Sequence, residues 1–285
     1  MSRAPISVVI PAYNAEDYLE EAIQSVYAQT LQPAEIIVIA DDCTDRTPQI
    51  AAKLGVIVLQ QKRRNMAAGL NLGVRASSQP WIALLDADDL WNKRKLALQW
   101  KAIKSCPAAA LVSCDLSILV DKKVTPILSP TQARDRWKDL DYVTVHDHCY
   151  YLEKIPGDFL PRFNIGTPTV MLRRDVFARV GFFDETLIFL QALELFARVM
   201  AAYPMAYVER SLVYYRRHDR NHSKNPEAFW PMYFSIVNRM LKNPDLYPEG
   251  AGKAYREHLK KQFYHFERAF AQGNFKIDDQ ANAES

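Results

Sequence analysis

The sequence predicts an α/β protein with a mostly parallel sheet, helices on both faces of that sheet, and further helices near the C-terminus. Three observations lead to this class. The first third of the chain alternates β-branched runs with amphipathic segments, which is typical of βαβ units. These runs are apolar almost throughout, as in strands buried on both faces. The 285 residues are 49% hydrophobic and 24% charged, which suits a packed core.

The expected strands are short runs bounded by proline, glycine or polar residues. They are Ile6–Ile10, Glu35–Ala40, Val56–Leu59, Trp81–Leu85, Ala108–Val120 and a strand near Ala206–Val208. The segment from Thr125 to Phe163 mixes proline with scattered aromatic residues and shows no period, so we expect irregular loops there.

The expected helices follow these strands. In the first one, Asn14 is placed as the N-cap, and Glu16 and Asp17 suit the positive end of the helix dipole. The helices predicted after it cover 48–54, stopped by Gly55, then 67–76, 93–105, 175–180, 189–203, 229–241 and 252–270.

Charge and cysteine usage exclude several classes of protein. The formal charge of +3, from 36 basic and 33 acidic residues, is too balanced for a nucleic-acid-binding protein. The four cysteines form no Cys-x-x-Cys pair, so zinc-ligand spacing is absent and reduced thiols are expected. No apolar run reaches the length of a membrane-spanning helix, and the N-terminus lacks a signal-peptide pattern. We therefore expect a cytoplasmic protein, with any membrane contact made peripherally at the inner face.

The most informative motif is acidic and follows a predicted buried strand. Asp86-Ala87-Asp88-Asp89 places carboxylates where the strand ends. Ligands of open α/β sheets bind at the carboxyl ends of strands, and Mg²⁺ is bound through one or two carboxylates together with substrate phosphates. The motif therefore indicates a metal site, although a solvated turn that caps the next helix would show the same residues.

Two further strand ends carry polar residues. Asp41 can accept hydrogen bonds from a nucleobase or a ribose hydroxyl, or the segment can serve only to cap a helix through Thr44 or Asp45. In the turn Pro11-Ala12-Tyr13-Asn14, the ring of Tyr13 can stack on a base or simply pack over the helix start.

The motifs are more specific in combination. The segments concerned are 7–14, 41–47, 68–73, 85–89, 173–185 and 215–223. Their order and spacing resemble family 2 glycosyltransferases of the GT-A fold, a Rossmann-like nucleotide-binding sheet. The resemblance implies inverting transfer of a sugar from a nucleotide-diphosphate-sugar, with UDP-sugars favoured, to a hydroxyl acceptor that the sequence does not identify.

The resemblance also implies roles for individual residues. The nucleotide-sugar would be bound by Pro11, Ala12, Tyr13, Asn14, Asp41, Arg63, Arg64, Asn71, Asp86, Ala87 and Arg217. A Mn²⁺ or Mg²⁺ ion would be held by Asp88, with Asp86 and His218 beside it. Ala40 departs from the family pattern, which has an aspartate there, so the nucleoside contact rests more heavily on Asp41.

A second departure concerns the catalytic base. The position that carries the family's base is Ala192, and the replacements we consider are Glu194, Glu185 and Asp158. The alternative is a relative that binds the donor with impaired turnover. A pyrophosphorylase or a dinucleotide-dependent dehydrogenase would need a glycine-rich phosphate loop, and the nine glycines include no Gly-x-Gly.

The predicted organisation has four parts. They are a nucleotide-sugar-binding half at 1–120, an acceptor-side half of the same domain at 121–225, a helical appendage at 226–275 and a flexible tail at 276–285. Aromatic and basic residues within 226–272 suit an anionic membrane or a homodimer contact, unless they close the core. These residues are Phe229, Trp230, Tyr233, Phe234, Lys253, Arg256, Lys260 and Lys261.

Overall fold

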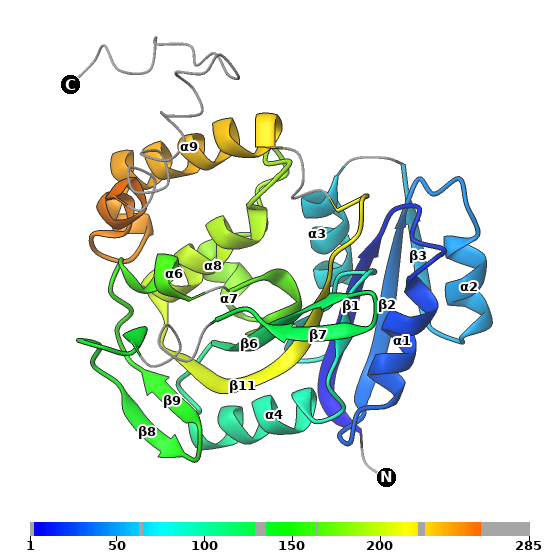
Figure 1. The fold of residues 1–285 in the computed structure, drawn as a ribbon, viewed down its shortest axis with the longest axis horizontal. Helices are drawn as coiled ribbons and strands as arrows, with labels where there is room; N and C mark the ends of the chain where they lie inside the picture. The colour runs from blue at the N-terminus through cyan, green and yellow to red at the C-terminus, as the bar shows by residue number, and fades with distance from the viewer. Residues whose placement is uncertain (1–2, 63–64, 129–134, 164, 222–225, 258–285) are drawn as a thin grey trace.

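The computed structural model describes residues 3–62, 65–128, 135–163, 165–221 and 226–257. In these residues one sheet of eleven strands runs through the molecule in the order β3-β2-β1-β4-β10-β6-β11-β9-β8, with β5 on β11 and β7 on β6. Figure 1 shows the N-terminal strands at one end of this sheet and the β8–β9 hairpin at the other. The expected halves 1–120 and 121–225 both contribute strands to it.

The N-terminal half has the expected alternation of strands and helices. Its strands β1 to β4 are parallel, which confirms the βαβ reading. They are β1 Ala4–Ala12, β2 Pro33–Asp41, β3 Ile57–Gln61 and β4 Trp81–Leu84. The helices are α1 Leu19–Tyr27, α2 Thr47–Lys53, α3 Met66–Ala76 and α4 Lys95–Ser105.

The predicted start of the first helix is wrong. Helix α1 begins at Leu19, and Asn14 has a φ of +46°. The Asn14 carboxamide oxygen accepts a hydrogen bond from the Thr44 backbone N–H at 2.8 Å. Asn14 therefore fastens the turn after β1 to the loop after β2, which places both strand ends beside each other.

The second half of the sheet begins with β10, which is antiparallel to both of its neighbours, β4 and β6. Beyond it, β6 and β11 pair in parallel over most of their length. The bounds are β5 Leu90–Trp91, β6 Leu111–Val120, β7 Lys123–Pro126, β8 Val143–His146, β9 Cys149–Leu152, β10 Met171–Arg173 and β11 Met205–Arg216.

Two sequence predictions fail in this half. The region 125–163 was expected to be irregular, yet it contains the β8–β9 hairpin and α6 Phe159–Arg162. Strands β8 and β9 are only four residues each, and β8 lies on exposed positions at Val143 and Thr144, so the alternation of Val143 to His146 is too short to stand out from the irregular segment around it. Strand β11 extends eight residues beyond the predicted Val208, because a bulge interrupts its apolar pattern.

The core lies on both faces of the sheet. Val9 of β1 belongs to the cluster that contains α3, α8 and α9, whereas Val8 and Ile10 belong to the cluster under α1 and α4. A strand buried on both faces must be apolar at successive positions, which explains the sequence of β1. Helix α3 lies very close to this strand, since a Cβ added at Gly73 would be 2.3 Å from a methyl carbon of Val9.

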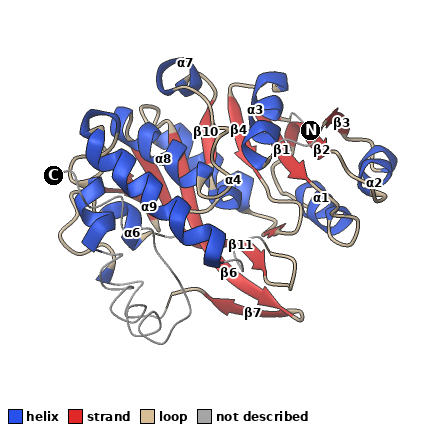
Figure 2. Cartoon of the chain, turned by 90° about the horizontal axis from the view of Figure 1, so that it is seen from above, coloured by secondary structure: helices blue, strands red, loops and turns tan. Residues whose placement is uncertain are grey.

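The C-terminal helices complete the core cluster of α3 and α8. They are α7 Val176–Val180, α8 Gln191–Ala202, α9 Pro226–Lys242 and a helical segment at 251–257, with 3₁₀ turns at Thr167–Thr169 and Pro244–Leu246. Figure 2 shows α8 and α9 together at one end of the molecule and α1 to α3 at the other.

The core-closing interpretation of the appendage fits the side chains that are described. Ile236, Val237 and Met240 of α9 are buried against the main core, together with Tyr247 and Tyr255. The predicted membrane or dimer contact depends on residues of which several lie outside the described part, and it stays a prediction. The structure describes the backbone of Phe229, Trp230 and Phe234 but not their side chains, and Lys260, Lys261 and the predicted tail at 276–285 lie outside the described residues. Within the described ranges, no helix has the length and apolar character needed to cross a bilayer.

Candidate active site

The acidic motif lies where β4 ends, at the carboxyl edge of the sheet. Asp86 follows the buried Leu84-Leu85 pair, and its Oδ1 is buried without a hydrogen-bond partner among the described residues. Burial, followed by the neighbouring charge of Asp88, raises the pKa of Asp86 to about 8. A buried carboxylate oxygen without a partner is costly unless a cation or a proton accompanies it.

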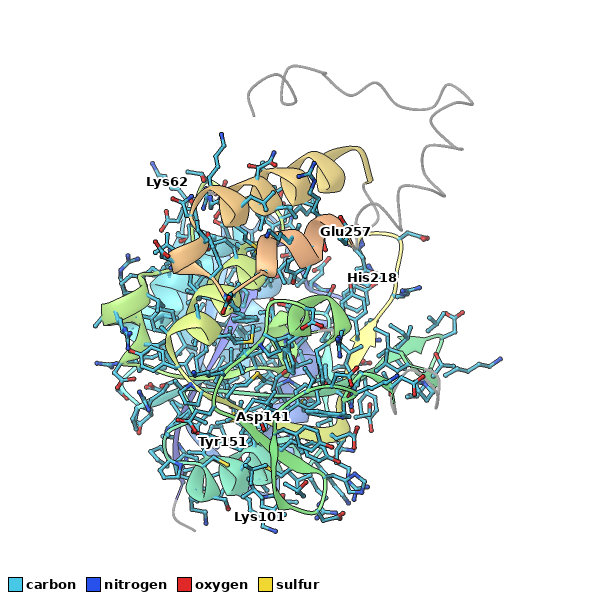
Figure 3. All side chains as sticks on the ribbon, turned by 90° about the vertical axis from the view of Figure 1, so that its left-hand side faces the viewer. Lys62, Lys101, Asp141, Tyr151, His218 and Glu257 are labelled. Carbon is cyan, nitrogen blue, oxygen red and sulfur yellow. The ribbon has the colours of Figure 1, made fainter. Side chains whose placement is uncertain are left out.

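Asp88 is held by residues from the end of β11. Its Oδ2 lies 2.9 Å from His218 Nε2 and accepts a hydrogen bond from Asn221 Nδ2 at 3.3 Å. Arg216 Nε donates to the Asp88 backbone oxygen at 2.9 Å. The imidazole of His218 is stacked on Tyr18, with ring centroids 4.5 Å apart. Figure 3 labels His218 beside the end of β11, in the upper part of the molecule.

Asp89, the third acid of the motif, has a different role. It is fully buried, and its Oδ1 accepts a hydrogen bond from the Arg216 backbone N–H at 2.9 Å. Burial and the charges of Asp86 and Asp88 raise its pKa well above the usual range. Asp89 therefore joins the motif to β11, which places Arg216 against Asp88.

The acidic cluster suits a divalent cation that a substrate completes. Within the described residues no three His, Cys, Asp or Glu side chains converge as a ready-made metal site. Asp88 and the unpartnered oxygen of Asp86 offer the one or two carboxylates with which proteins hold Mg²⁺ when phosphates supply further ligands. His218 Nε2 faces Asp88 itself, so this nitrogen would have to leave Asp88 to bind a metal directly.

A polar hollow of about 310 Å³ lies beside the ends of β2 and β3. Its lining residues are Ala40, Asp42, Cys43, Pro48, Gln60, Gln61 and Lys62. Next to it, the largely buried Asp41 accepts a hydrogen bond from Gln61 Nε2 at 3.0 Å. Asp42 adopts a φ of +52°, and its backbone N–H donates to the Gln61 oxygen. Gln61 thus orients Asp41, a role that the sequence did not indicate.

The turn after β1 borders the same end of the sheet. Ala12 is buried, and its backbone oxygen lies 3.4 Å from Cys43 Sγ, while the residue Tyr13 is 40% exposed. Asp45 accepts hydrogen bonds from the backbone N–H groups of Glu16 and Thr47, so its role is structural. The predicted phosphate contacts Arg63 and Arg64 lie outside the described residues, and the side chain of Arg217 is exposed.

Asn71 is bonded within the chain. Its Nδ2 donates to the Phe183 oxygen and to Glu185 Oε1, both at 2.9 Å, and its Oδ1 accepts from the Phe183 N–H. Asn65, at the start of α3, donates to the Glu185 backbone oxygen at 2.7 Å. These bonds fix the exposed Glu185 against α3 and occupy the Asn71 carboxamide within the chain, so donor binding by Asn71 stays a prediction.

The position of the family's base and the two other candidate replacements, Glu194 and Asp158, lie in different surroundings. Ala192 is 9% exposed at the second residue of α8. Glu194, two residues further, is 2% exposed, and its carboxylate accepts two hydrogen bonds from Arg198 and one from Tyr247. It is thus part of a structural network rather than open to a substrate. Asp158 pairs with Arg162 one turn along α6.

A second ion pair supports this network. Arg239 of α9 donates to Asp184 Oδ2 at 2.5 Å and lies 3.9 Å from Glu194 Oε1. Burial alone would raise the pKa of Asp184, but hydrogen bonds from Thr186 and Arg239 outweigh it and lower the pKa to about 2. Helix α9 is therefore attached by charge to the segment that carries Glu185.

These features define an α/β sheet with an acidic cluster at the end of β4, the last strand of its parallel block. The family model described as Glycosyl transferase family 2 matches residues 7–181, and the chain belongs to that family. It is 26% identical over 246 residues to an uncharacterized glycosyltransferase of Rickettsia typhi and 27% identical over 206 residues to one of Rickettsia prowazekii. The alignments cover 82% and 70% of this chain, and 73% and 60% of the relatives.

Solved structures show the same fold. Staphylococcus aureus TarS, as residues 1–349, superposes with a TM-score of 0.68 at 17% identity, covering 96% of this chain and 76% of that one. Its complex with UDP-GlcNAc superposes with a TM-score of 0.63 at 18% identity over 83% and 66% of the chains. The likeness confirms the predicted GT-A arrangement, and family membership confirms the predicted enzyme class.

Proposed function

We propose that this glycosyltransferase transfers a sugar from a UDP-sugar to a hydroxyl acceptor, with inversion and with the help of Mn²⁺ or Mg²⁺. The observation that carries the proposal is the arrangement at the end of β4. Asp88 is oriented by His218 and Asn221, and the neighbouring Asp86, whose charge interacts with that of Asp88, has a buried oxygen without a partner among the described residues. This acidic corner attracts a cation, and a diphosphate would complete its ligands.

The donor would extend from this corner to the hollow beside β2. Asp41, oriented by Gln61, offers a carboxylate oxygen to the nucleoside, and the exposed ring of Tyr13 offers a stacking surface. Asp88 and Asp86 would hold the cation, which when bound neutralises charge on the leaving diphosphate. The TarS complexes with UDP and UDP-GlcNAc support the choice of a uridine donor.

Glu185 is our choice for the group that removes the acceptor proton. Its carboxylate is exposed, and Asn71 and Asn65 fix both its side chain and its backbone against α3. Glu194 is not chosen as this base, because its carboxylate is buried in an ion pair with Arg198. The acceptor itself would enter from the part of the chain at 121–225, which supplies the 183–185 segment.

Ala192 supports a second candidate function. Ala192, at the start of α8, carries a methyl group where the family has its base. This suits a protein that binds the donor and turns it over slowly or not at all. A general base contributes about 10²–10⁴-fold to a rate. The two candidates share the donor site and differ in turnover.

Calorimetric titration of UDP, GDP and TDP, with Mn²⁺ or with EDTA, tests the donor site. We expect UDP to bind with Mn²⁺ and to lose about tenfold or more in affinity in EDTA. Asp88→Asn should cause a similar loss with an unchanged fold, whereas Asp245→Asn, an exposed surface change, should not. Equal affinity in Mn²⁺ and EDTA would contradict the metal-dependent site.

Turnover separates the two candidate functions. The rate of UDP-GlcNAc hydrolysis with Mn²⁺ can be measured as UDP released into solution. This assay detects cleavage of the donor even though the acceptor is unknown. A measurable rate that Glu185→Gln abolishes supports the enzyme with Glu185 as base. Tight UDP-GlcNAc binding with no release of UDP, in the presence of a panel of sugar acceptors, supports the binding function.

A further inference from the structure

A second hollow, of about 380 Å³, lies between α4 and the β8–β9 hairpin. None of its lining residues belongs to the candidate active site. Figure 3 shows one of them, Lys101, at the bottom of the molecule, whereas Lys62 and His218 lie in its upper part. The hollow is therefore a separate feature of the chain, and the family's chemistry does not account for it.

The hollow arises from the bulge in β11. Strand β9 pairs with β11 up to Val208, and β5 pairs with it again from Val213. Between these pairings the register against β6 shifts on both sides of Ser211. A bulge bends its strand and interrupts the neighbouring ladder. Here it separates the hairpin from β5 and α4, and the space between them opens over Val208 and Leu212.

Positive charge collects around this opening. Arg94 directly precedes α4, and Leu98 and Lys101 of the helix follow it at spacings of four and three residues, so the three line the same side of the opening. Arg94 and Lys101 are exposed, and in the described part of the chain neither forms an ion pair with a carboxylate. Across the opening, Arg210 pairs with Asp147 in an exposed contact of 3.1 Å, which a stronger anion can replace.

The remaining lining offers apolar surface and hydrogen-bonding groups. Leu98, Val208 and Leu212 provide apolar atoms, while Asn92 and Ser211 provide polar ones. His146 has its Nε2 buried without a partner among the described residues, and its Nδ1 lies 3.5 Å from the Asp147 backbone oxygen. A proton on Nδ1 leaves Nε2 as an acceptor that suits a ligand hydroxyl.

We propose that this hollow, defined by Arg94, Lys101 and Arg210, is a binding site for a small phosphorylated molecule rich in hydroxyl groups, such as a sugar phosphate. Three cations face one carboxylate, and arginine binds phosphate through paired N–H donors. The volume is that of a small-molecule site. The phosphate lies between the helix cations and Arg210, and the hydroxyl-bearing part lies over the apolar floor near His146.

Calorimetry with glucose 6-phosphate tests this site in the full chain, with EDTA present and then with UDP and Mg²⁺ present. Glucose is the uncharged control. We expect saturable binding of glucose 6-phosphate that weakens with added salt and is unchanged by UDP, and no binding of glucose. The variant Arg94→Ser/Lys101→Ser should weaken binding by about tenfold or more. Lys104→Ser, an exposed lysine of the same helix that does not line the hollow, should change it less than about twofold.

Hydrogen exchange places the ligand. Glucose 6-phosphate should slow exchange in α4 and in β8–β9, and leave α1 and α2 unchanged. The proposal is overturned if no saturable binding occurs up to about 10 mM, if the double variant binds as well as the wild type, or if protection falls on α1 and α2. Binding to vesicles that contain phosphatidic acid, without binding of glucose 6-phosphate, would also overturn it, because the ligand would then be a membrane surface.

Discussion

The buried ion pair of α8 allows a direct test of whether Glu194 is structural or catalytic. Glu194→Gln keeps the shape of the side chain but removes the charge that faces Arg198 at 2.7 Å. The amide cannot accept both hydrogen bonds of the guanidinium, which is itself largely buried. Arg198 would keep its contact with the Phe182 oxygen and lose its carboxylate partner.

Breaking a buried pair by removing one partner costs about 3–5 kcal/mol. For a chain of 285 residues, whose unfolding entropy is about 0.6 kcal/mol/K, this lowers Tm by about 5–8 °C. Thermal unfolding followed by circular dichroism measures this change. The rate of UDP-GlcNAc hydrolysis, measured below the unfolding transition and divided by the folded fraction, should stay within about threefold of the wild type, since the buried Glu194 carboxylate is occupied by Arg198 and Tyr247.

The double variant Glu194→Leu/Arg198→Met provides the control for this prediction. Removing both charges leaves neither one unpaired, so much of the lost stability should return. The reasoning would be refuted if Glu194→Gln left Tm within about 1 °C of the wild type and lowered the rate by about 10²–10⁴-fold. That pattern is the one expected of a catalytic base.

Four further outcomes follow from the structure. Gly73→Ala should lower the free energy of unfolding by about 1–3 kcal/mol, measured in urea, because its Cβ would overlap a methyl group of Val9; unchanged stability would show that α3 can shift. Glu185→Gln should lower the hydrolysis rate by about 10²-fold or more with unchanged Tm, and an equal rate would remove Glu185 as the base. Ala192→Asp should raise the rate about tenfold if the missing carboxylate limits turnover, whereas an unchanged rate would show that the base lies elsewhere. Asp184 has a folded pKa of about 2, below its unfolded value, so its contribution to stability is present above about pH 4 and lost as pH falls toward 2; Asp184→Asn should flatten this acid-induced loss.

The sequence predicted the parallel half of the fold because local patterns determine it. Val8, Val9 and Ile10 are consecutive apolar residues, and only a strand buried on both faces needs such a run. The same logic located Asp86 and Asp88, since residues that follow buried strands gather at one edge of a parallel sheet. The roles of these two residues in binding stay predictions.

Long-range contacts were beyond the reach of local patterns. Arg216 and Asn221 hold Asp88 from 128 and 133 residues away, and no periodicity connects them. The sequence did not predict that Gln61 bonds to Asp41 either, because Gln61 lies on a neighbouring strand. The β8–β9 hairpin escaped prediction because each of its strands is only four residues long, too short for a clear periodic signal. The start of α1 was misplaced because Asn14 bonds to Thr44 instead of capping a helix.

The way in which β11 holds the acidic motif has a consequence for recombination between relatives. The family match ends at residue 181, yet Arg216 and His218 hold the backbone and the carboxylate of Asp88. A chimaera joined at that boundary would combine an acidic motif from one parent with its supporting residues from another. The segments 81–91 and 205–221 should therefore be taken from the same parent. Chimaeras that keep both segments together should preserve the geometry of Asp88.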